Sequence, residues 1–303
     1  MDEVKSLVRR RIGIVGKGGS GKSTTTVLMA KVLRERGYEV IVLDADSTNV
    51  GLHQILELKS APASLIDYFG GMVFSGGSVT CPVDDPTPLP DAEVTLDQLS
   101  DGYYARNREG IILLTAGKIG DRGPGAGCDG PINKIARDFK LRSEDPSPVT
   151  LVDFKAGFED SARGAITSLD WVIVVVDPTN AAIQMAIHMK EMVAQIKAGK
   201  PPSTQHLESP ELAELAKLIF REARIKDVLV ILNRVVDEEM ENFLQERLEQ
   251  HGIKPIGTIR EDPSLTITWL KGKPLLETEA QKDVERIIRI LEAIEEEPAH
   301  PIK

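Results

Sequence analysis

The chain has 303 residues, and 41% of them are hydrophobic, which provides for a sizeable core and excludes global disorder. Its formal net charge of −10 disfavours a dedicated nucleic-acid surface, because neutralising phosphates requires clustered lysine and arginine. Two cysteines, no signal peptide and no apolar run of the ~18 residues that a membrane span needs predict a cytoplasmic protein without a disulfide scaffold.

Short runs of apolar, often β-branched residues alternate with helical patterns along the chain. We expect strands at residues 11–16, 39–44, 110–117, 149–154, 171–177, 227–233 and 254–259. We expect helices at residues 21–36, 181–196, 209–223, 238–252 and 281–297. Near-continuous apolar strands with helical crossovers predict an α/β fold of three layers, in which helices cover both faces of a mainly parallel sheet. Ligands bind such sheets at the carboxyl ends of the strands.

We expect residues 1–303 to form a single P-loop domain with two inserted loops. Residues 70–107 are rich in Gly, Pro and Asp, and residues 198–209 form a polar stretch between two helical patterns. Both compositions are typical of surface insertions. The last helical pattern, 281–297, is amphipathic and is expected to pack on the sheet. Because its end is acidic, anionic lipid would repel it, and we expect no membrane partner.

The segment from Gly16 to Ser23 fits the phosphate-loop pattern G-x-x-x-x-G-K-[ST] and lies between an expected strand and an expected helix. Lys22 is expected to reach the β- and γ-phosphates of ATP, Ser23 to bind Mg²⁺ and Thr24 to contact the α-phosphate. The backbone N–H groups of the loop would hold the phosphates with the helix N-terminus. Further contacts are expected from Gly16, Gly18, Gly19, Ser20 and Gly21. The alternative is a glycine-rich turn that binds nothing, which the full motif and its context disfavour.

Lys17, near the front of the loop, extends the pattern to K-G-G-x-G-K-[ST], the deviant Walker A signature. Over about Arg11 to Leu275 the chain therefore resembles a family of dimeric P-loop ATPases. That family includes MinD and ParA, the arsenite pump ATPase, the nitrogenase iron protein and the carbon monoxide dehydrogenase maturation ATPase. The resemblance implies a nucleotide-bridged homodimer in which Lys17 reaches the partner's nucleotide, so that hydrolysis depends on dimerisation. The alternative for Lys17 is a solvated loop lysine.

Three aspartates follow expected strands and are candidates for the acidic switches of this family. Asp153, in LVDFKAG, matches the pattern D-x-x-[AG]-G, which implies a carboxylate on Mg²⁺ with Gly157 as the hinge that senses the γ-phosphate. Asp44 and Asp46 lie in VLDADST. Asp44 is expected nearer the metal, and Asp46 is expected to position the attacking water. For a single aspartate the alternative is a helix cap or a turn residue.

The base of the nucleotide has its own candidate residues later in the chain. Asn233 follows a strand at the place where the asparagine of the resembled family binds adenine, and Arg234 is next to it. Asp262 and Pro263 lie in GTIREDPSL, which is similar to the segment that lines the other side of the base. The alternative is an ordinary strand-to-helix turn.

Cys128 lies where members of the resembled family carry metal-binding cysteines. The segments GIILLTAGK and AGFEDSARG on either side look closest to the carbon monoxide dehydrogenase maturation, or nickel-insertion, ATPases. Gly130 replaces the second cysteine of their C-x-C motif, so a dimer offers two thiols, too few for the four that an Fe₄S₄ cluster takes. Two thiolates with Asp129 or water could hold Zn²⁺ or Ni²⁺ at the dimer interface. The alternatives are an interchain disulfide and an inert thiol, the commonest state of a loop cysteine.

These patterns together predict a slow Mg-ATP hydrolase that changes conformation as a homodimer and acts on a client protein. The first hypothesis for the client is a metalloenzyme whose metal centre is being assembled. The second is a spatial-organising or partner-recruiting switch of the MinD and ParA type, which carries no metal. Electron transfer through a bridging cluster is a weak third, because ligands are missing. The acidic balance argues against a nucleic-acid partner.

Overall fold

The computed structural model describes residues 5–118, 129–142, 147–157, 164–200, 202, 207, 209–275 and 278–296. Within these ranges, one eight-stranded sheet has the order β10-β9-β8-β1-β7-β2-β5-β4. Neighbouring strands are parallel, except that β4 pairs antiparallel with β5 at one edge. The strands are β1 (Arg11–Gly16), β2 (Val40–Ala45), β4 (Ala105–Arg106), β5 (Ile112–Thr115), β7 (Val149–Phe154), β8 (Trp171–Val176), β9 (Asp227–Val235) and β10 (Gly257–Arg260).

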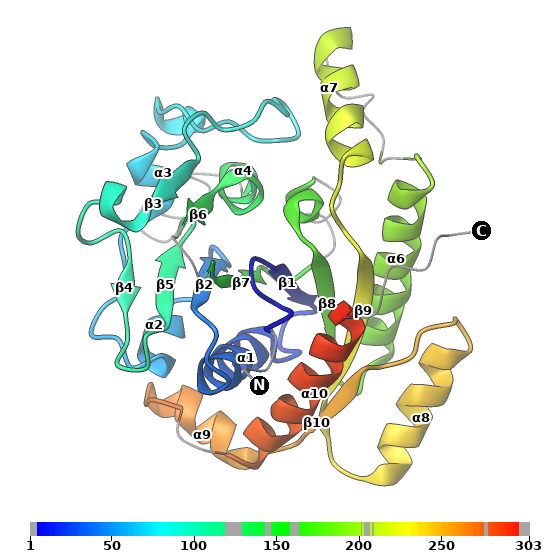
Figure 1. Ribbon diagram of the computed structural model, residues 1–303. Coiled ribbons are helices and arrows are strands. Elements are labelled where there is room, and N and C mark those ends of the chain that lie inside the picture. The colour runs from blue at the N-terminus through cyan, green and yellow to red at the C-terminus, as the bar shows by residue number, and fades with distance from the viewer. Residues whose placement is uncertain are drawn as a thin grey trace.

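Helices cover both faces of this sheet, which confirms the expected α/β fold (Figure 1). Helices α1 (Lys22–Glu35) and α10 (Glu279–Glu296) pack on one face. Helices α4 (Gly130–Asp138), α6 (Asn180–Lys197) and α8 (Glu238–Glu249) pack on the other. The amphipathic C-terminal pattern is confirmed as a sheet-packing helix, because α10 buries its apolar stripe against α1 and β10.

Each central strand supplies both cores, because successive side chains of a strand point to opposite faces. In β2, Val40 and Val42 belong to the core under α1 and α10, whereas Ile41 and Leu43 belong to the core under α4, α6 and α8. All six residues of β1, β2 and β8 are buried, as expected for parallel strands covered on both sides.

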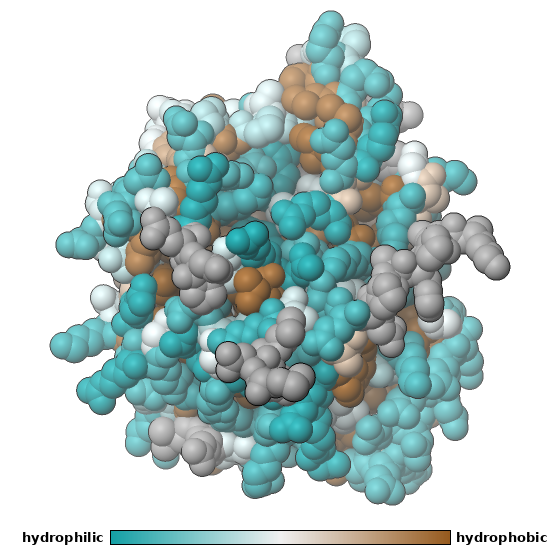
Figure 2. All heavy atoms as spheres, viewed as in Figure 1, coloured by the Kyte–Doolittle hydropathy of each residue, from teal (hydrophilic) through white to brown (hydrophobic). Residues whose placement is uncertain are grey.

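Several short elements have no apolar run in the sequence and were not expected. Strands β3 (Glu93–Thr95) and β6 (Lys140–Arg142) pair with each other in a separate parallel ribbon. Helices α2 (Leu52–Ile55), α3 (Leu65–Tyr68) and α9 (Pro263–Lys271) were not expected either, nor were the 3-10 turns η1 (Val73–Ser75), η2 (Leu96–Gln98) and η4 (Ala165–Ser168). Helix α7 (Pro210–Arg221), in contrast, confirms the helix expected at residues 209–223. Helix α7 projects from the body at the top of Figure 1, and Figure 2 shows hydrophobic residues on its visible side.

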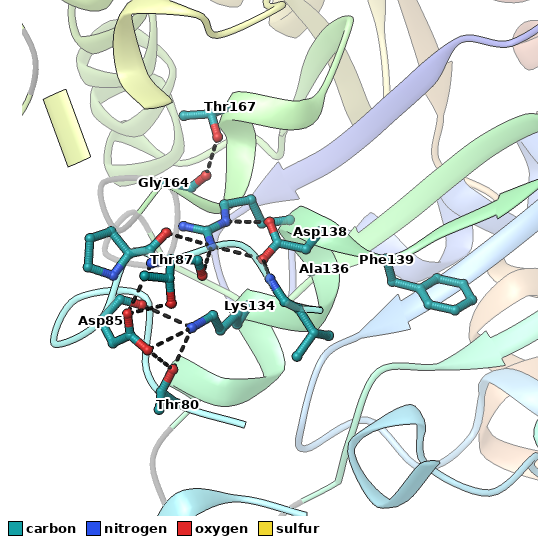
Figure 3. Close-up of polar contacts among 12 residues, drawn as sticks. Thr80, Asp85, Thr87, Lys134, Ala136, Asp138, Phe139, Gly164 and Thr167 are labelled. Atoms are coloured by element: carbon teal, nitrogen blue, oxygen red, sulfur yellow. Dashed lines mark hydrogen bonds and ion pairs between the residues drawn. The ribbon is translucent and has the colours of Figure 1, made fainter. Parts of the chain in front are cut away.

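The segment 70–107 packs closely against helix α4. Lys134 of α4 donates hydrogen bonds to the Thr80 hydroxyl at 2.5 Å and to the Asp85 carboxylate at 3.3 Å (Figure 3). Arg137 of the same helix donates to the carbonyls of residues 86 and 87, at 3.1 and 3.2 Å. Met72 and Val79 of the segment are buried in the core that α4 covers. Buried charges on α4 therefore hold the inserted segment in place.

None of the described helices is both long enough and apolar enough to cross a membrane.

Replacing Asp85 with alanine tests the contact between α4 and the inserted segment. Lys134 has only 3% of its side chain exposed, so the substitution leaves an ammonium buried without its carboxylate. We expect the free energy of unfolding, measured by urea denaturation, to fall by about 2 kcal/mol. The double variant Asp85→Ala/Lys134→Met should recover most of that loss, because the unpaired charge is gone.

The matched control is Glu93→Ala, which removes ion pairs to the exposed side chains of Lys140 and Arg142. Its effect should stay below about 0.5 kcal/mol. An Asp85→Ala variant as stable as this control would show that the clamp on α4 contributes nothing.

Candidate functional site

The carboxyl ends of β1, β7 and β2 meet at one edge of the sheet, because these strands are neighbours. Asp153 of β7 lies opposite Asp44 of β2 in the parallel register. Strand β1 leads into the loop of residues 17–21, and α1 begins directly after it at Lys22. The fold therefore brings the phosphate-loop motif and two of the candidate aspartates together.

The loop after β1 turns at two glycines with positive φ, Gly19 at 82° and Gly21 at 96°. A Cβ atom on Gly21 would lie 2.1 Å from the side-chain nitrogen of Asn233, so this close approach requires glycine. The same nitrogen donates a hydrogen bond to the Ser20 carbonyl at 2.7 Å. Asn233, a candidate for the base, therefore also braces the phosphate loop from the end of β9.

The loop presents polar groups that suit a phosphate. The Ser20 hydroxyl is buried and has no hydrogen-bond partner among the described residues. The Lys22 ammonium donates to the Lys17 carbonyl at 2.9 Å, whereas the Lys17 side chain is exposed. Burial lowers the pKa of Lys22, and nearby carboxylates, Asp153 first among them, oppose that shift. These groups fit an anion with several oxygens, as the motif predicts.

The two strand-end aspartates form a buried acidic pair. Burial raises the pKa of Asp153 to about 7, with a further rise from Asp44 beside it. Burial also raises the pKa of Asp44 to about 6, and Lys118 opposes that rise. The Ser23 hydroxyl donates to the Asp153 carboxylate at 2.6 Å. A hydroxyl and buried carboxylates are oxygen ligands of the kind that Mg²⁺ takes, so the residues fit this ion.

Asp46 occupies the turn that follows β2. Its Oδ1 atom accepts hydrogen bonds from the Thr48 N–H at 2.9 Å and the Thr48 hydroxyl at 2.7 Å. Asn49, further along the turn, donates from its side-chain nitrogen to the Ser23 hydroxyl at 2.9 Å. The turn after β2 is thus connected directly to the first turn of α1.

Gly157 lies close to the phosphate loop on the other side. Its N–H points to the Gly16 carbonyl at 3.4 Å, and its φ of 124° is one that side chains rarely allow. The preceding Ala156 lines the cavity described next. A phosphate between the loop and this glycine would therefore meet both segments.

A cavity of about 450 Å³ opens beside these groups, within the size range of small-ligand sites. Its phosphate-loop end is formed by Gly18, Gly19, Gly21, Lys22, Ser23 and Thr24. Asp46, Thr48 and Asn49 line its side. Its far end is formed by Asn233, Arg234, Arg260, Glu261, Asp262, Leu265, Thr266 and Trp269.

Three of the candidate base residues, Asn233, Arg234 and Asp262, line the far end of the cavity, whereas Pro263 is not among its lining residues. Arg234 has a φ of 60°, unusual for a residue with a side chain. Asp262 caps α9 by accepting the Ser264 N–H at 2.9 Å, and Pro263 is the first residue of that helix. The backbone conformation at Arg234 and the cap at Asp262 both limit movement of the cavity lining. Asp262 therefore caps α9 and lines the cavity at the same time.

Three residues at or beside the site were given no role in the sequence analysis. Lys118 contacts Asp44, Asn49 contacts Ser23, and Trp269 packs on the turn after β2 at Gly51. Leu265 and Trp269 are four residues apart on α9 and therefore face the cavity together. That spacing was the only local signal, because the other contacts join residues distant in sequence.

Cys128 lies outside the described residues. Asp129, directly after it, accepts a hydrogen bond at 2.6 Å from Lys155, which is two residues from Asp153. Cys81 is buried in the core. Among the residues with described placement, no group of three or more His, Cys, Asp or Glu side chains could hold a metal ion.

Residues 14–275 match the family described as CbiA: CobQ/CobB/MinD/ParA nucleotide binding domain. The chain is 34% identical to an uncharacterized ATP-binding protein of Methanocaldococcus jannaschii over 185 residues, which are 60% of this chain and 72% of that protein. It is 22% identical to the carbon monoxide dehydrogenase accessory protein CooC of Rhodospirillum rubrum over 201 residues, 61% of this chain and 70% of that protein.

Solved structures share the fold. The septum site-determining protein MinD of Pyrococcus horikoshii, complexed with Mg-ADP, aligns over 94% of this chain and 98% of that chain with a TM-score of 0.54. The two sequences are 18% identical, so the likeness concerns the fold alone.

The acidic pair predicts how the stability of the nucleotide-free protein depends on pH. The pKa of Asp153 is about 7 in the folded chain and near 3.8 in the unfolded chain, so the folded state binds more protons between these values. Stability should therefore fall as pH rises from about 4 to about 7. Asp153→Asn removes this titration and should stabilise the magnesium-free protein at pH 8 by about 1–2 kcal/mol.

Urea denaturation at pH 5 and pH 8 in EDTA measures the effect, with Asp91→Asn as the control. Asp91 is exposed and has a positive φ, which asparagine also adopts readily. A pH slope that is the same in wild type and Asp153→Asn would contradict the raised pKa.

Proposed function

The chain belongs to the CobQ/CobB/MinD/ParA family of nucleotide-binding domains, and on that premise we propose that it is a slow, dimeric Mg-ATP-hydrolysing switch. The observation that carries the proposal is the pair of Lys22 and Ser23 at the phosphate-loop end of the cavity, with the buried Asp153 carboxylate hydrogen-bonded to Ser23. We also propose that residues 1–303 act as one P-loop ATPase domain with insertions near 70–107 and 198–209. Two cores built on one sheet support this.

The phosphates are the first part of the proposed ligand. Lys22 would leave the Lys17 carbonyl for the β- and γ-phosphates, because a charge-assisted bond to phosphate is stronger than one to a neutral carbonyl. Thr24 would contact the α-phosphate from the first turn of α1. The backbone N–H groups that would turn toward the phosphate oxygens are those of Gly16, Gly18, Gly19, Ser20 and Gly21.

The acidic residues are proposed to serve the metal and the water. Ser23 and Asp153 would hold Mg²⁺, and Asp44 would act nearer to it than Asp46. When bound, the ion would neutralise charge on the β- and γ-phosphates. Asp46, at the side of the cavity, is the candidate that orients the attacking water. Gly157 would sense the γ-phosphate through its N–H, since that group already lies by the phosphate loop.

The base would lie at the far end of the cavity. Asn233, Arg234 and Asp262 line this end, and Pro263 follows Asp262 as the first residue of α9. Because Asn233 also bonds the Ser20 carbonyl, the base and phosphate ends of the site are linked by a single side chain.

A second copy of the chain is proposed to complete the site. Lys17 is exposed at the front of the loop, where its ammonium is accessible to a partner. A cation brought in from outside stabilises the charge that grows during phosphoryl transfer, and an arginine supplied in this way is worth ~10³–10⁵ in rate. Hydrolysis would then be slow in monomers and would report dimer formation.

Metal-centre assembly in a metalloenzyme is the client step that we propose first. The similarity to the accessory protein CooC supports it, together with the position of Cys128 beside Asp129. The Lys155–Asp129 ion pair provides a connection from the segment after β7 to the residue after Cys128. Two Cys128 thiolates in a homodimer would hold Zn²⁺ or Ni²⁺ with a carboxylate or water.

The second candidate is a switch of the MinD and ParA type without a bound metal. It is supported by the family match over residues 14–275, whose description includes MinD and ParA. Under this alternative the ATP cycle recruits a partner protein, and the cysteine is inert.

Metal content of the purified dimer separates these two candidates. We expect about one Zn²⁺ or Ni²⁺ per dimer by elemental analysis, lost in Cys128→Ser and kept in a Cys81→Ala control. The assay runs with and without ATP, beside a measurement of dimer mass. Metal-free wild-type protein that still dimerises with ATP would reject metal assembly and leave the metal-free switch.

Mixing two inactive variants tests whether Lys17 acts across the dimer. Lys17→Ala and Asp46→Ala should each lower turnover by about 10³-fold while nucleotide binding persists. In a one-to-one mixture, half of the dimers are hybrids with one complete site, so turnover should return to about a quarter of wild type. A mixture of Lys17→Ala with the double variant Lys17→Ala/Asp46→Ala is the control and should stay inactive. If the first mixture also stays inactive, Lys17 does not act in trans.

A further inference from the structure

Lys118 lies at the site but belongs to none of its motifs. It follows β5, which pairs with β2 on the side away from β7. Its ammonium donates to the Asp44 carboxylate at 2.6 Å and to the Asp46 carbonyl at 2.6 Å. The side chains of Lys118 and Asp44 are only 17% and 5% exposed. The contact is therefore a largely buried ion pair with a second, directional bond to the backbone.

These bonds close a ring around the end of β2. The second oxygen of the Asp44 carboxylate accepts the Asp46 N–H at 3.1 Å. Lys118 thus binds both the Asp44 carboxylate and the Asp46 carbonyl, and the Asp44 carboxylate in turn accepts the N–H of Asp46. The ring fixes the backbone orientation at Asp46, from which the side chain of Asp46 departs toward the cavity.

Among the residues that the structure describes, the turn beyond this ring makes weaker contacts. Asp46 accepts bonds within the turn from Thr48, Asn49 reaches the Ser23 hydroxyl, and Gly51 lies against Trp269. A Cβ atom on Gly51 would come within 3.3 Å of the Trp269 ring, so the ring covers the end of the turn closely. The charged contact with Lys118 is the strongest of these attachments, because its donor and one of its acceptors are ionised.

A purely structural ion pair would require only the Asp44 carboxylate. The bond to the Asp46 carbonyl adds a constraint on the residue proposed to orient water, and reaction rates depend steeply on such geometry. A displacement of about 1 Å can cost about 10²-fold in rate. Charge also matters, because Asp44 lies beside Asp153 and Lys118 places a cation on the face of Asp44 away from β7.

We infer that Lys118 is a positioning residue that holds the turn of residues 44–51, and with it the Asp46 carboxylate, in the orientation that hydrolysis requires. The inference rests on the proposed ATPase function and adds a residue that no phosphate-loop or acidic motif contains. Lys118 acts through Asp44 and the Asp46 backbone, so its loss should affect turnover and leave nucleotide binding in place.

Steady-state kinetics of Lys118→Met, Lys118→Arg and Lys190→Met test the effect on turnover. Lys190 is the matched control, because it forms a partly buried pair with Asp227 away from the cavity. Lys118→Met should lower kcat by about 10–100-fold and leave KM for ATP within about threefold at saturating Mg²⁺. Lys118→Arg should restore most of the lost kcat, and Lys190→Met should match wild type. An unchanged kcat in Lys118→Met, or a rise in KM as large as the fall in kcat, overturns the inference.

A second readout does not require hydrolysis. Trp269 covers the end of the turn. The chain has one other tryptophan, Trp171, which is the first residue of β8, at the end of the strand away from the cavity. A Trp171→Phe background therefore makes Trp269 the sole tryptophan reporter. In that background Lys118→Met should make Trp269 more accessible to acrylamide, seen as a larger quenching constant. Lys118→Arg and Lys190→Met should not.

The two readouts distinguish the failure of either proposal. If wild-type protein does not cleave ATP, the proposed function fails, and Trp269 quenching alone decides the role of Lys118. Quenching that is identical in Lys118→Met and wild type shows that Lys118 does not hold the turn. If Lys118→Met does not fold, Lys118→Ala replaces it with the same expected fall in kcat and rise in quenching, because alanine also lacks a donor for the Asp46 carbonyl.

Discussion

Two aspartates from adjacent parallel strands lie side by side in the interior, and this repulsive pair constrains the rest of the site. The register of β2 and β7 puts Asp44 opposite Asp153, and burial raises the pKa of both carboxyls. Buried like charges persist only where neighbouring groups compensate for them. Lys118 donates to Asp44, the Ser23 hydroxyl donates to Asp153, and the charge of Lys22 favours the ionised form of Asp153. A divalent cation at this position would relieve the remaining repulsion, which relates the electrostatics of the fold to its proposed ligand.

Contacts between the segments around this pair hold the residues that line the cavity in fixed positions. Gly21 lets Asn233 approach the phosphate loop, and Asn233 in turn fixes the Ser20 carbonyl. At the same time the turn after β2 touches both α1, through Asn49, and α9, where Trp269 covers Gly51. A movement of the phosphate loop would therefore also move Asn233 at the far end of the cavity and the turn that contacts α9. Such linkage is what a nucleotide-dependent switch requires.

The sequence predicted the parts of the site that depend on local patterns. The phosphate loop, the strands that precede Asp44, Asp153 and Asn233, and the sheet-packing C-terminal helix were all recognisable from short motifs and periodicity. The pairing of Asp44 with Asp153 could not be read from the chain, because it depends on strand order and register. Lys118 was missed for the same reason, since its partners lie 72 and 74 residues away. The sequence analysis also gave no role to Lys134 and Arg137 of α4, because their burial depends on contacts with the inserted segment about 50 residues earlier in the chain.

The central claim is that the buried carboxylates exist to hold magnesium together with a nucleotide. Calorimetric titration of ADP into the protein, with Mg²⁺ and with EDTA, tests it most directly in wild type and Asp153→Asn. We predict that Mg²⁺ tightens ADP binding at least about tenfold in wild type and has little effect in Asp153→Asn. Equal ADP affinity with and without Mg²⁺ in the wild-type protein would contradict the account.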